Sequence, residues 1–156
     1  MSTKIEIGAD GWIAAHLDLY QRTNGAEGQL MDFSKTGGPA ETPCLILKTT
    51  GRKSGEAKLL PLIYGRDGDR FVIVASKGGA PQHPAWYLNL AADPEVGFQV
   101  VDKKYRGVAR TVSGEERTRL FAMMAAVFPP YTAYQARTDR EIPVVVLEPQ
   151  GEIDAL

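Results

Sequence analysis

Residues 44–75 read CLILKTTGRKSGEAKLLPLIYGRDGDRFVIVA, and this pattern decides the fold class. Apolar runs and turn segments alternate within it, at 44–49, 51–55, 57–64, 65–69 and 71–75. The second turn segment contains Asp67 followed by Gly68, a pair that strongly favours a β-hairpin. The last run is rich in β-branched residues, which fit a strand. We therefore expect three antiparallel strands that follow one another as a meander.

Helix signals lie on both sides of this stretch. A first helix is expected over 10–22, with Asp10 as its N-cap and one largely apolar face. Ser113 is the expected N-cap of a helix that runs to Val127, with Glu116 at the spacing of a capping box. The remaining expected elements are helices over 81–91 and 131–137 and strands over 96–101, 105–112 and 143–147. The strands over 96–101 and 105–112 are expected to form a second hairpin around residues 102–104.

The order of these elements predicts the architecture. Segment 23–42 is rich in Gly, Ser, Thr and Pro and is expected to be a long irregular loop. Antiparallel strands with helices inserted between hairpins are typical of the α+β class, and we expect a small, partly open β-barrel. A length of 156 residues fits one domain over 1–156, in which the N-terminal helix and loop occupy about 1–42.

Composition and charge exclude several classes of function. The formal net charge is −1, whereas nucleic-acid-binding domains usually carry a clear basic excess, so we expect no nucleic-acid partner. The sequence shows no signal-peptide pattern and no apolar stretch approaching about 20 residues, which favours a cytoplasmic protein. Cys44, the only cysteine, stands in an apolar run where we expect a buried, unreactive thiol. His16 and His83 are the only histidines, so no metal site is expected.

A basic turn separates the first two expected strands. Arg52, Lys53 and Lys58 stand with Lys48 against a single acid, Glu56. Guanidinium and ammonium groups suit a phosphate or carboxylate, and the neighbouring glycines let the backbone approach such a ligand closely. The same residues also fit a solvated hairpin turn, so both interpretations stay open at this point.

A second candidate segment, 75–84, joins the last strand of the meander to the next helix. Free N–H groups at the start of a helix attract anions, and Ser76 and Lys77 are placed to reach a polar ligand edge. Trp86 and Tyr87 follow and offer flat rings for stacking. A Gly-rich connector and core aromatics are the alternative interpretations.

Two tyrosines form a third candidate. Tyr131 and Tyr134 are three positions apart and share one side of the expected short helix. A tyrosine offers a flat face and a weakly acidic O–H, which suits a planar molecule that carries an oxygen. The alternative interpretation is a helix that packs through two tyrosines.

Taken in order, these segments resemble the deazaflavin (F420)-dependent nitroreductase family. The matching pieces are LKTTGRKSG at 47–55, VASKGGAP at 74–81, HPAWYLNL at 83–90, YTAY at 131–134 and DREIP at 139–143. The resemblance runs from about residue 42 to residue 148. It implies a split β-barrel, coenzyme F420 and an F420H2-dependent reductase that passes a hydride to a quinone, nitroaromatic or enone-type acceptor.

The resemblance also implies roles for particular residues. The implied cofactor-binding residues are Arg52, Lys53, Ser54, Lys58, Leu59, Leu60, Pro61, Leu62, Val74, Ala75, Ser76, Lys77, Ala85, Trp86, Tyr87, Leu88, Asn89 and Tyr131. The implied catalytic residues are Ser76, Tyr131 and Tyr134. Phe128 departs from the family pattern, because nitroreducing members often carry a tyrosine there, and this puts nitroimidazole activation in doubt.

Several alternatives stay open at this stage. The protein is either an enzyme or a non-catalytic F420 carrier, and a split barrel that binds FMN or haem would also use the basic turn. The apolar stripe over 12–20 either packs on the barrel or makes a peripheral membrane contact. An exposed sheet edge and the loose 23–42 segment favour a homodimer.

Overall fold

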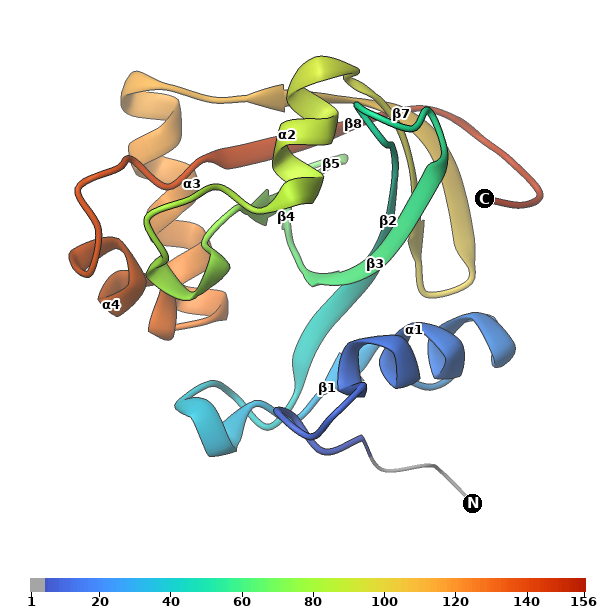
Figure 1. Ribbon diagram of the computed structural model, residues 1–156, viewed down its shortest axis with the longest axis horizontal. Coiled ribbons are helices and arrows are strands. Elements are labelled where there is room, and N and C mark those ends of the chain that lie inside the picture. The colour runs from blue at the N-terminus through green and yellow to red at the C-terminus, as the bar shows by residue number, and fades with distance from the viewer. Residues whose placement is uncertain (1–4) are drawn as a thin grey trace.

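The computed structural model describes residues 5–156 and contains one eight-stranded antiparallel sheet with four flanking α-helices (Figure 1). The strands are β1 (Leu30–Met31), β2 (Thr42–Thr50), β3 (Ala57–Ile63), β4 (Gly65–Asp67), β5 (Arg70–Val74), β6 (Glu95–Val100), β7 (Lys103–Thr111) and β8 (Val144–Glu152). The helices are α1 (Trp12–Arg22), α2 (Ala85–Ala92), α3 (Gly114–Val127) and α4 (Pro130–Ala136), with short 3-10 turns at Ser34–Thr36 and Lys77–Gly79. The sheet curls, as expected for a partly open barrel of the α+β class.

The sheet order is β1-β2-β6-β7-β8-β5-β4, and β3 pairs with β2 outside this path. The hairpin of β2 and β3 is confirmed, with Cys44 opposite Ile63 and Thr50 opposite Ala57. The hairpin at Asp67-Gly68 is also confirmed, because β4 and β5 pair across it. The predicted turn segment 65–69 is therefore partly strand.

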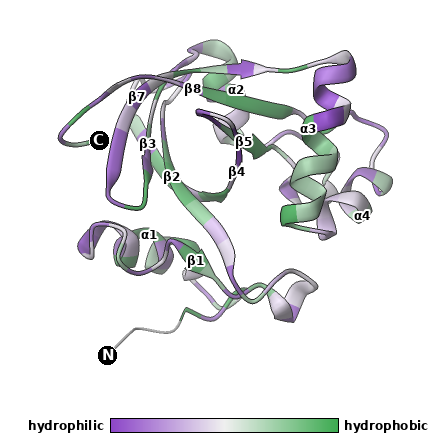
Figure 2. Ribbon diagram, turned by 180° about the vertical axis from the view of Figure 1, so that it is seen from behind, coloured by the Kyte–Doolittle hydropathy of each residue, from purple (hydrophilic) through white to green (hydrophobic). Residues whose placement is uncertain are grey.

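The predicted meander is wrong beyond its first hairpin. After Ile63 the chain crosses to the far end of the sheet, where β5 pairs with β4 and β8. The reason is burial: the side chains of Phe71–Val74 are at most 6% exposed, and the apolar residues 144–147 of β8 are fully buried beside them. Strands that are apolar on both faces take central positions. Figure 2 shows β8 as hydrophobic over most of its visible length.

Helix starts differ from the expected caps. Helix α1 begins at Trp12 after Gly11, whose φ is +71°, so Asp10 is not the N-cap. Ser113 does occupy the N-cap position of α3, but its side chain makes no capping hydrogen bond. Glu116 instead accepts two hydrogen bonds from the Arg110 guanidinium, at 2.9 and 3.1 Å. A charged, bidentate partner outcompetes the capping box for this carboxylate.

The other boundaries shift by a few residues. Helix α2 begins only at Ala85, because Pro84 is extended and forms its N-cap position. Strand β8 continues to Glu152, well past the apolar run at 143–147 that signalled it. The expected loop over 23–42 contains β1 and one 3-10 turn. No helix within residues 5–156 is long and apolar enough to cross a membrane.

Residues 5–41 form an N-terminal arm that packs against the barrel. Tyr20 on α1 is fully buried, and its hydroxyl lies 3.0 Å from the Cys44 carbonyl oxygen. The same hydroxyl accepts the backbone N–H of Val101 at 2.8 Å. In Figure 1, α1 and β1 form a layer below the main part of the sheet. Cys44 is buried as expected, and burial raises the pKa of its thiol to about 12.

The hydroxyl of Tyr20 is expected to contribute to stability, because Tyr20→Phe leaves the buried Cys44 carbonyl and the part-buried Val101 N–H without this partner. We expect the free energy of unfolding to fall by about 1–3 kcal/mol, measured by urea denaturation. Tyr64→Phe is the matched control, since the Tyr64 hydroxyl makes no hydrogen bond within residues 5–156. Equal stability of the two variants would contradict the anchoring role of Tyr20.

Candidate functional site: a two-part cleft

Two cavities meet on one side of the barrel and share Leu60 and Trp86 in their walls. The first, of about 470 Å³, is here called the apolar cavity. It is lined by Ile7, Gly8, Trp12, Ile13, His16, Phe33, Thr36, Cys44, Leu60, Pro61, Leu62, Ile63, Val74, Ser76, Lys77, Gly78, Pro84, Trp86, Phe128, Tyr131 and Tyr134. The second, of about 440 Å³, is called the basic cavity, and it is lined by Gly51, Arg52, Lys53, Ser54, Lys58, Leu59, Leu60, Ala85, Trp86 and Asn89.

The basic cavity is built where the β2–β3 turn meets α2. The Asn89 side chain is buried, and its Oδ1 accepts hydrogen bonds from the backbone N–H and the guanidinium of Arg52, at 3.2 and 2.9 Å. This turn leaves little room at Gly51, because a Cβ atom there would lie 2.7 Å from the Ser54 Oγ and 3.2 Å from the Glu56 carbonyl oxygen. Helix α2 therefore fixes the turn and leaves further N–H groups of Arg52 for a ligand.

The charge of the basic cavity is unbalanced. Lys53 has no ion-pair partner within residues 5–156, while Lys58 lies 3.6 Å from the exposed carboxylate of Glu56. Three cations thus face one acid at the mouth of the cavity. Such a cluster attracts a phosphate or carboxylate, which favours the anion-binding interpretation of the turn over the solvated one.

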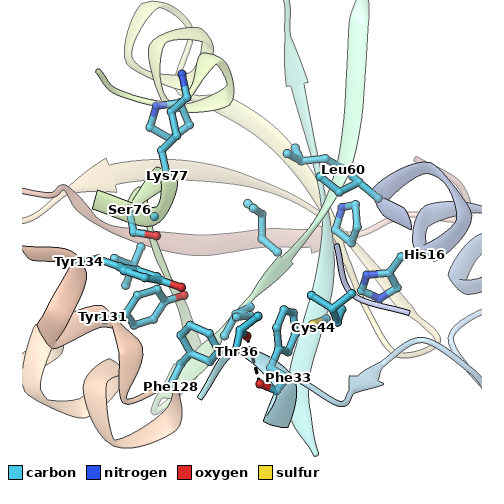
Figure 3. Close-up of a pocket in the computed structure, with 18 of the residues that line it drawn as sticks. His16, Phe33, Thr36, Cys44, Leu60, Ser76, Lys77, Phe128, Tyr131 and Tyr134 are labelled. Atoms are coloured by element: carbon cyan, nitrogen blue, oxygen red, sulfur yellow. Dashed lines mark hydrogen bonds between the residues drawn. The ribbon is translucent and has the colours of Figure 1, made fainter. Parts of the chain in front are cut away.

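The apolar cavity lies between the barrel and the N-terminal arm (Figure 3). Strand β3 supplies one wall through Leu60–Ile63. Phe33 from the arm contacts Phe128 edge to face, with ring centroids 5.4 Å apart. Phe128 in turn contacts Tyr131 at 5.0 Å. Flat and aliphatic walls of this kind suit a planar conjugated ligand.

Three hydroxyls gather on one side of the apolar cavity. Figure 3 shows Ser76, Tyr131 and Tyr134 close together, on the side formed by α4 and the loop after β5. None of the three hydroxyls makes a hydrogen bond within residues 5–156. Tyr131 is only 4% exposed, and burial raises the pKa of its hydroxyl well above the ordinary value. Tyr131 therefore stays neutral near pH 7 and keeps its O–H for donation.

Arg140 holds the loop that carries Ser76. Its guanidinium donates to the backbone carbonyls of Ser76 and Ala80, both at 2.8 Å, and to that of Ala75 at 3.3 Å. It also donates to the Nδ1 of His83 at 3.0 Å. Lys77 in this loop has a φ of +46°, so the loop needs external support. Arg140 lies in the matching segment 139–143, but the sequence alone gives no sign of this supporting role.

Most predicted site residues line one of the two cavities, but three do not. Ala75 is fully buried in the core below the loop. Tyr87 hydrogen-bonds the Thr111 hydroxyl at 3.0 Å, and Leu88 is exposed on another face of α2. The 3.6-residue period explains this division, because only one face of α2 can meet the turn. Trp86 and Tyr131, expected as open aromatic sites, are largely buried and form walls instead.

Sequence reasoning missed the contribution of the N-terminal arm. Trp12, His16 and Phe33 line the apolar cavity, although the resemblance begins only at about residue 42. The apolar stripe on α1 was noticed, and its residues Leu19 and Tyr20 pack inward. This supports the packing interpretation of that stripe. Helix α1 contacts β3, which supplies a wall of the same cavity.

A cleft with a cationic end and an apolar, hydroxyl-bearing end defines a split-barrel protein that binds a flat ring with an anionic tail. Coenzyme F420 has this form, a deazaflavin ring with a phosphate and an acidic tail. The apolar cavity matches the ring of the coenzyme, and the neighbouring basic cavity matches its phosphate and acidic tail.

The comparisons with known proteins identify the family. The family model described as F420H(2)-dependent quinone reductase matches residues 12–149, and the chain belongs to this family. An F420H(2)-dependent quinone reductase from Mycobacterium tuberculosis (strain ATCC 25618 / H37Rv) is 41% identical over 135 residues, which are 85% of this chain and 86% of the relative.

Two solved structures agree with this assignment. An F420-H2 dependent reductase (FDR-A) is 42% identical with a TM-score of 0.64, and the match covers 68% of this chain and 94% of that chain. A protein described as a domain-swapped dimer is 35% identical with a TM-score of 0.66, covering 86% of this chain and 96% of that chain. The expected family, split barrel, coenzyme F420 and F420H2-dependent reductase class are thereby confirmed.

The two histidines predict how stability depends on pH. Burial lowers the pKa of His16, and burial together with the Arg140 charge lowers that of His83. In the unfolded chain a histidine is protonated as the pH falls through about 6.5, whereas in the folded protein protonation requires a lower pH. The free energy of unfolding should therefore fall as the pH drops below about 6.5.

Urea denaturation between about pH 5 and 7.5 tests this expectation, above the range in which Asp and Glu titrate. The variants His16→Gln and His83→Gln should each flatten the dependence. A stability that is constant across this range in the unmodified protein would contradict the expectation.

Proposed function

We propose that this protein reduces a quinone by hydride transfer from reduced coenzyme F420, with the quinone held in the apolar cavity. The observation that carries the proposal is the pair of neighbouring cavities that share Leu60 and Trp86. One is cationic, and the other is apolar with three hydroxyls that make no hydrogen bond within residues 5–156. The name of the family and of the 41% identical mycobacterial relative supports a quinone as acceptor.

Particular residues fit the parts of the coenzyme. Arg52, Lys53 and Lys58 would hold its phosphate and acidic tail at the basic cavity. Leu60 and Trp86 would lie along its flat ring where the cavities meet. When bound, the coenzyme supplies the hydride. The protein then contributes orientation, exclusion of water and electrostatic stabilisation.

The hydroxyls of Ser76, Tyr131 and Tyr134 act on the acceptor. A hydride that reaches the quinone ring puts negative charge on a quinone oxygen, and neutral O–H groups beside it stabilise that charge. Burial keeps Tyr131 protonated, so its hydroxyl donates a hydrogen bond and holds its proton against this oxygen. The surrounding aromatic walls keep bulk water out and strengthen the interaction.

The walls of the cavity favour a quinone over the nitroaromatic and enone acceptors that the resemblance also implied. Phe128 is 3% exposed and presents a ring without a hydroxyl between Phe33 and Tyr131. A flat, mostly apolar acceptor with few polar atoms matches this surface. We therefore rank nitroaromatic and enone acceptors as secondary substrates.

We further propose a cytoplasmic homodimer. The 35% identical relative described as a domain-swapped dimer supports self-association. Cys44, the single cysteine of the chain, is buried, as suits a reducing compartment.

The basic cavity predicts a measurable loss of coenzyme affinity. In Lys53→Ala/Lys58→Ala, the Kd for reduced F420 should rise about tenfold at low salt, because two cations that face the anionic tail are lost. The salt dependence of binding should also become weaker. Lys103→Ala is the control, since Lys103 pairs with Glu152 and lies outside the cleft. Unchanged affinity in the double variant would remove the anion-binding role.

Tyr131 predicts a change in turnover rather than in binding. With menadione as acceptor, Tyr131→Phe should lower kcat about 10- to 100-fold while the Kd for reduced F420 stays nearly constant. Stopped-flow oxidation of the bound coenzyme measures the chemical step directly. An unaltered kcat would take Tyr131 out of the acceptor site. Coenzyme binding by the unmodified protein without turnover on any quinone would favour the carrier function.

A further inference from the structure

His16 stands on the side of the apolar cavity opposite the hydroxyls. It belongs to α1, it is 2% exposed, and it lines the cavity. Figure 3 shows it across the cavity from Tyr131 and Tyr134. The mechanism proposed above gives this imidazole no role.

The hydrogen bonding of His16 fixes its tautomer. Its Nε2 lies 2.7 Å from the backbone carbonyl oxygen of Gly28, which can only accept, so Nε2 carries the proton. Burial disfavours the charged ring and lowers the pKa of His16, so the ring is neutral near pH 7. A neutral imidazole has one N–H, and Nδ1 is therefore a bare acceptor.

The surroundings hold this ring in place and leave Nδ1 without a partner. Gly28 has a φ of +85°, and a Cβ atom there would lie 3.3 Å from the Cδ2 of His16, so the ring packs closely on this turn. No group within residues 5–156 donates to Nδ1. A ligand in the cavity that supplies an O–H or N–H gives this acceptor a hydrogen-bond partner.

We propose that His16 Nδ1 is a subsite of the apolar cavity for a hydroxyl of the ligand, and that it makes the cavity prefer the hydroquinone to the quinone. The inference rests on the proposed quinone reduction. A quinone plus one hydride from the reduced coenzyme and one proton from water gives a hydroquinone. The oxygens of the quinone only accept hydrogen bonds, whereas each hydroquinone oxygen carries a proton.

The two sides of the cavity then differ in their capacity to donate hydrogen bonds. The hydroxyls of Ser76, Tyr131 and Tyr134 both donate and accept, so they serve either form of the ligand. His16 Nδ1 only accepts, so it serves the reduced form alone. The N-terminal arm, through His16, thus favours binding of the hydroquinone product and of other aromatic ligands that carry a hydroxyl.

Calorimetric titration with two redox-inert probes tests this preference in the full-length protein. The probes are 1-naphthol, which donates a hydrogen bond, and 1-methoxynaphthalene, which does not. The unmodified protein should bind 1-naphthol about tenfold more tightly, as one recovered hydrogen bond implies. Neither coenzyme nor turnover is needed, so failure of this test and failure of the proposed reaction are distinguishable.

Two variants assign the preference to His16. His16→Gln keeps an N–H for the Gly28 carbonyl but loses the acceptor at the Nδ1 position, and its preference should fall to about twofold or less. His83→Gln makes the same change at the other histidine, outside both cavities, and should keep the tenfold preference. Equal preference in His16→Gln and the unmodified protein, or no preference in the latter, would overturn the proposal.

A measurement on the unmodified protein covers the case in which His16→Gln fails to fold. With ¹⁵N-labelled histidine, the Nδ1 resonance of His16 should shift when 1-naphthol is added and stay in place with 1-methoxynaphthalene. If the chemical shift of Nδ1 does not change at saturating 1-naphthol, the proposal is overturned independently of any variant.

Discussion

Strand β2 is the element on which the rest of the structure depends, because it pairs on both sides and is buried along most of its length. It pairs with β3 through seven residue pairs and with β6 through three, and Leu45, Ile46 and Leu47 are fully buried. Its start pairs with β1 of the N-terminal arm, and its end leads into the basic turn. One strand thus fixes the positions of both ends of the cleft.

The cleft exists because elements from distant parts of the chain meet around that strand. Helix α2 fixes the basic turn through the bonds from Arg52 to Asn89. The loop of Ser76 is held by Arg140, which lies 64 residues later in the chain. The arm closes the apolar cavity from the other side. None of these contacts is local in the sequence, so each depends on the arrangement of the folded sheet.

The sequence predicted the parts of this arrangement that are local. The basic turn and the tyrosine pair follow from spacing and residue type, and Arg52, Lys53, Ser76 and Tyr131 do line the cleft. The sequence predicts the adjacent pairs β2–β3 and β6–β7, and both form. It does not predict the place of β5, because burial beside β8 sets that place, whereas the Asp67-Gly68 signal specifies only the pairing of β5 with β4. The capping box at Ser113 failed for a related reason: a distant partner took the carboxylate of Glu116.

The role of the arm lay beyond sequence reasoning for a different reason. His16 appears in the sequence as one lone histidine on an apolar helix, and nothing in the spacing of α1 shows that its ring will face a cavity. That outcome depends on Tyr20, which anchors α1 to the barrel through Cys44 and Val101.

Polar groups of the apolar cavity that make no hydrogen bond within residues 5–156 indicate what kind of ligand it binds. Three hydroxyls and one imidazole nitrogen line a mostly apolar space without hydrogen-bond partners within residues 5–156. Ser76 and Tyr134 are only half-buried, and none of the four atoms is among the fully buried, unpartnered polar atoms of the described residues. The protein keeps the polar groups where a ligand can complete their hydrogen bonds. Arg140 fixes the loop of Ser76 on one side of the cavity, and Tyr20 fixes helix α1 on the other. These groups therefore favour filling of the cavity by a flat molecule that carries oxygens at both ends.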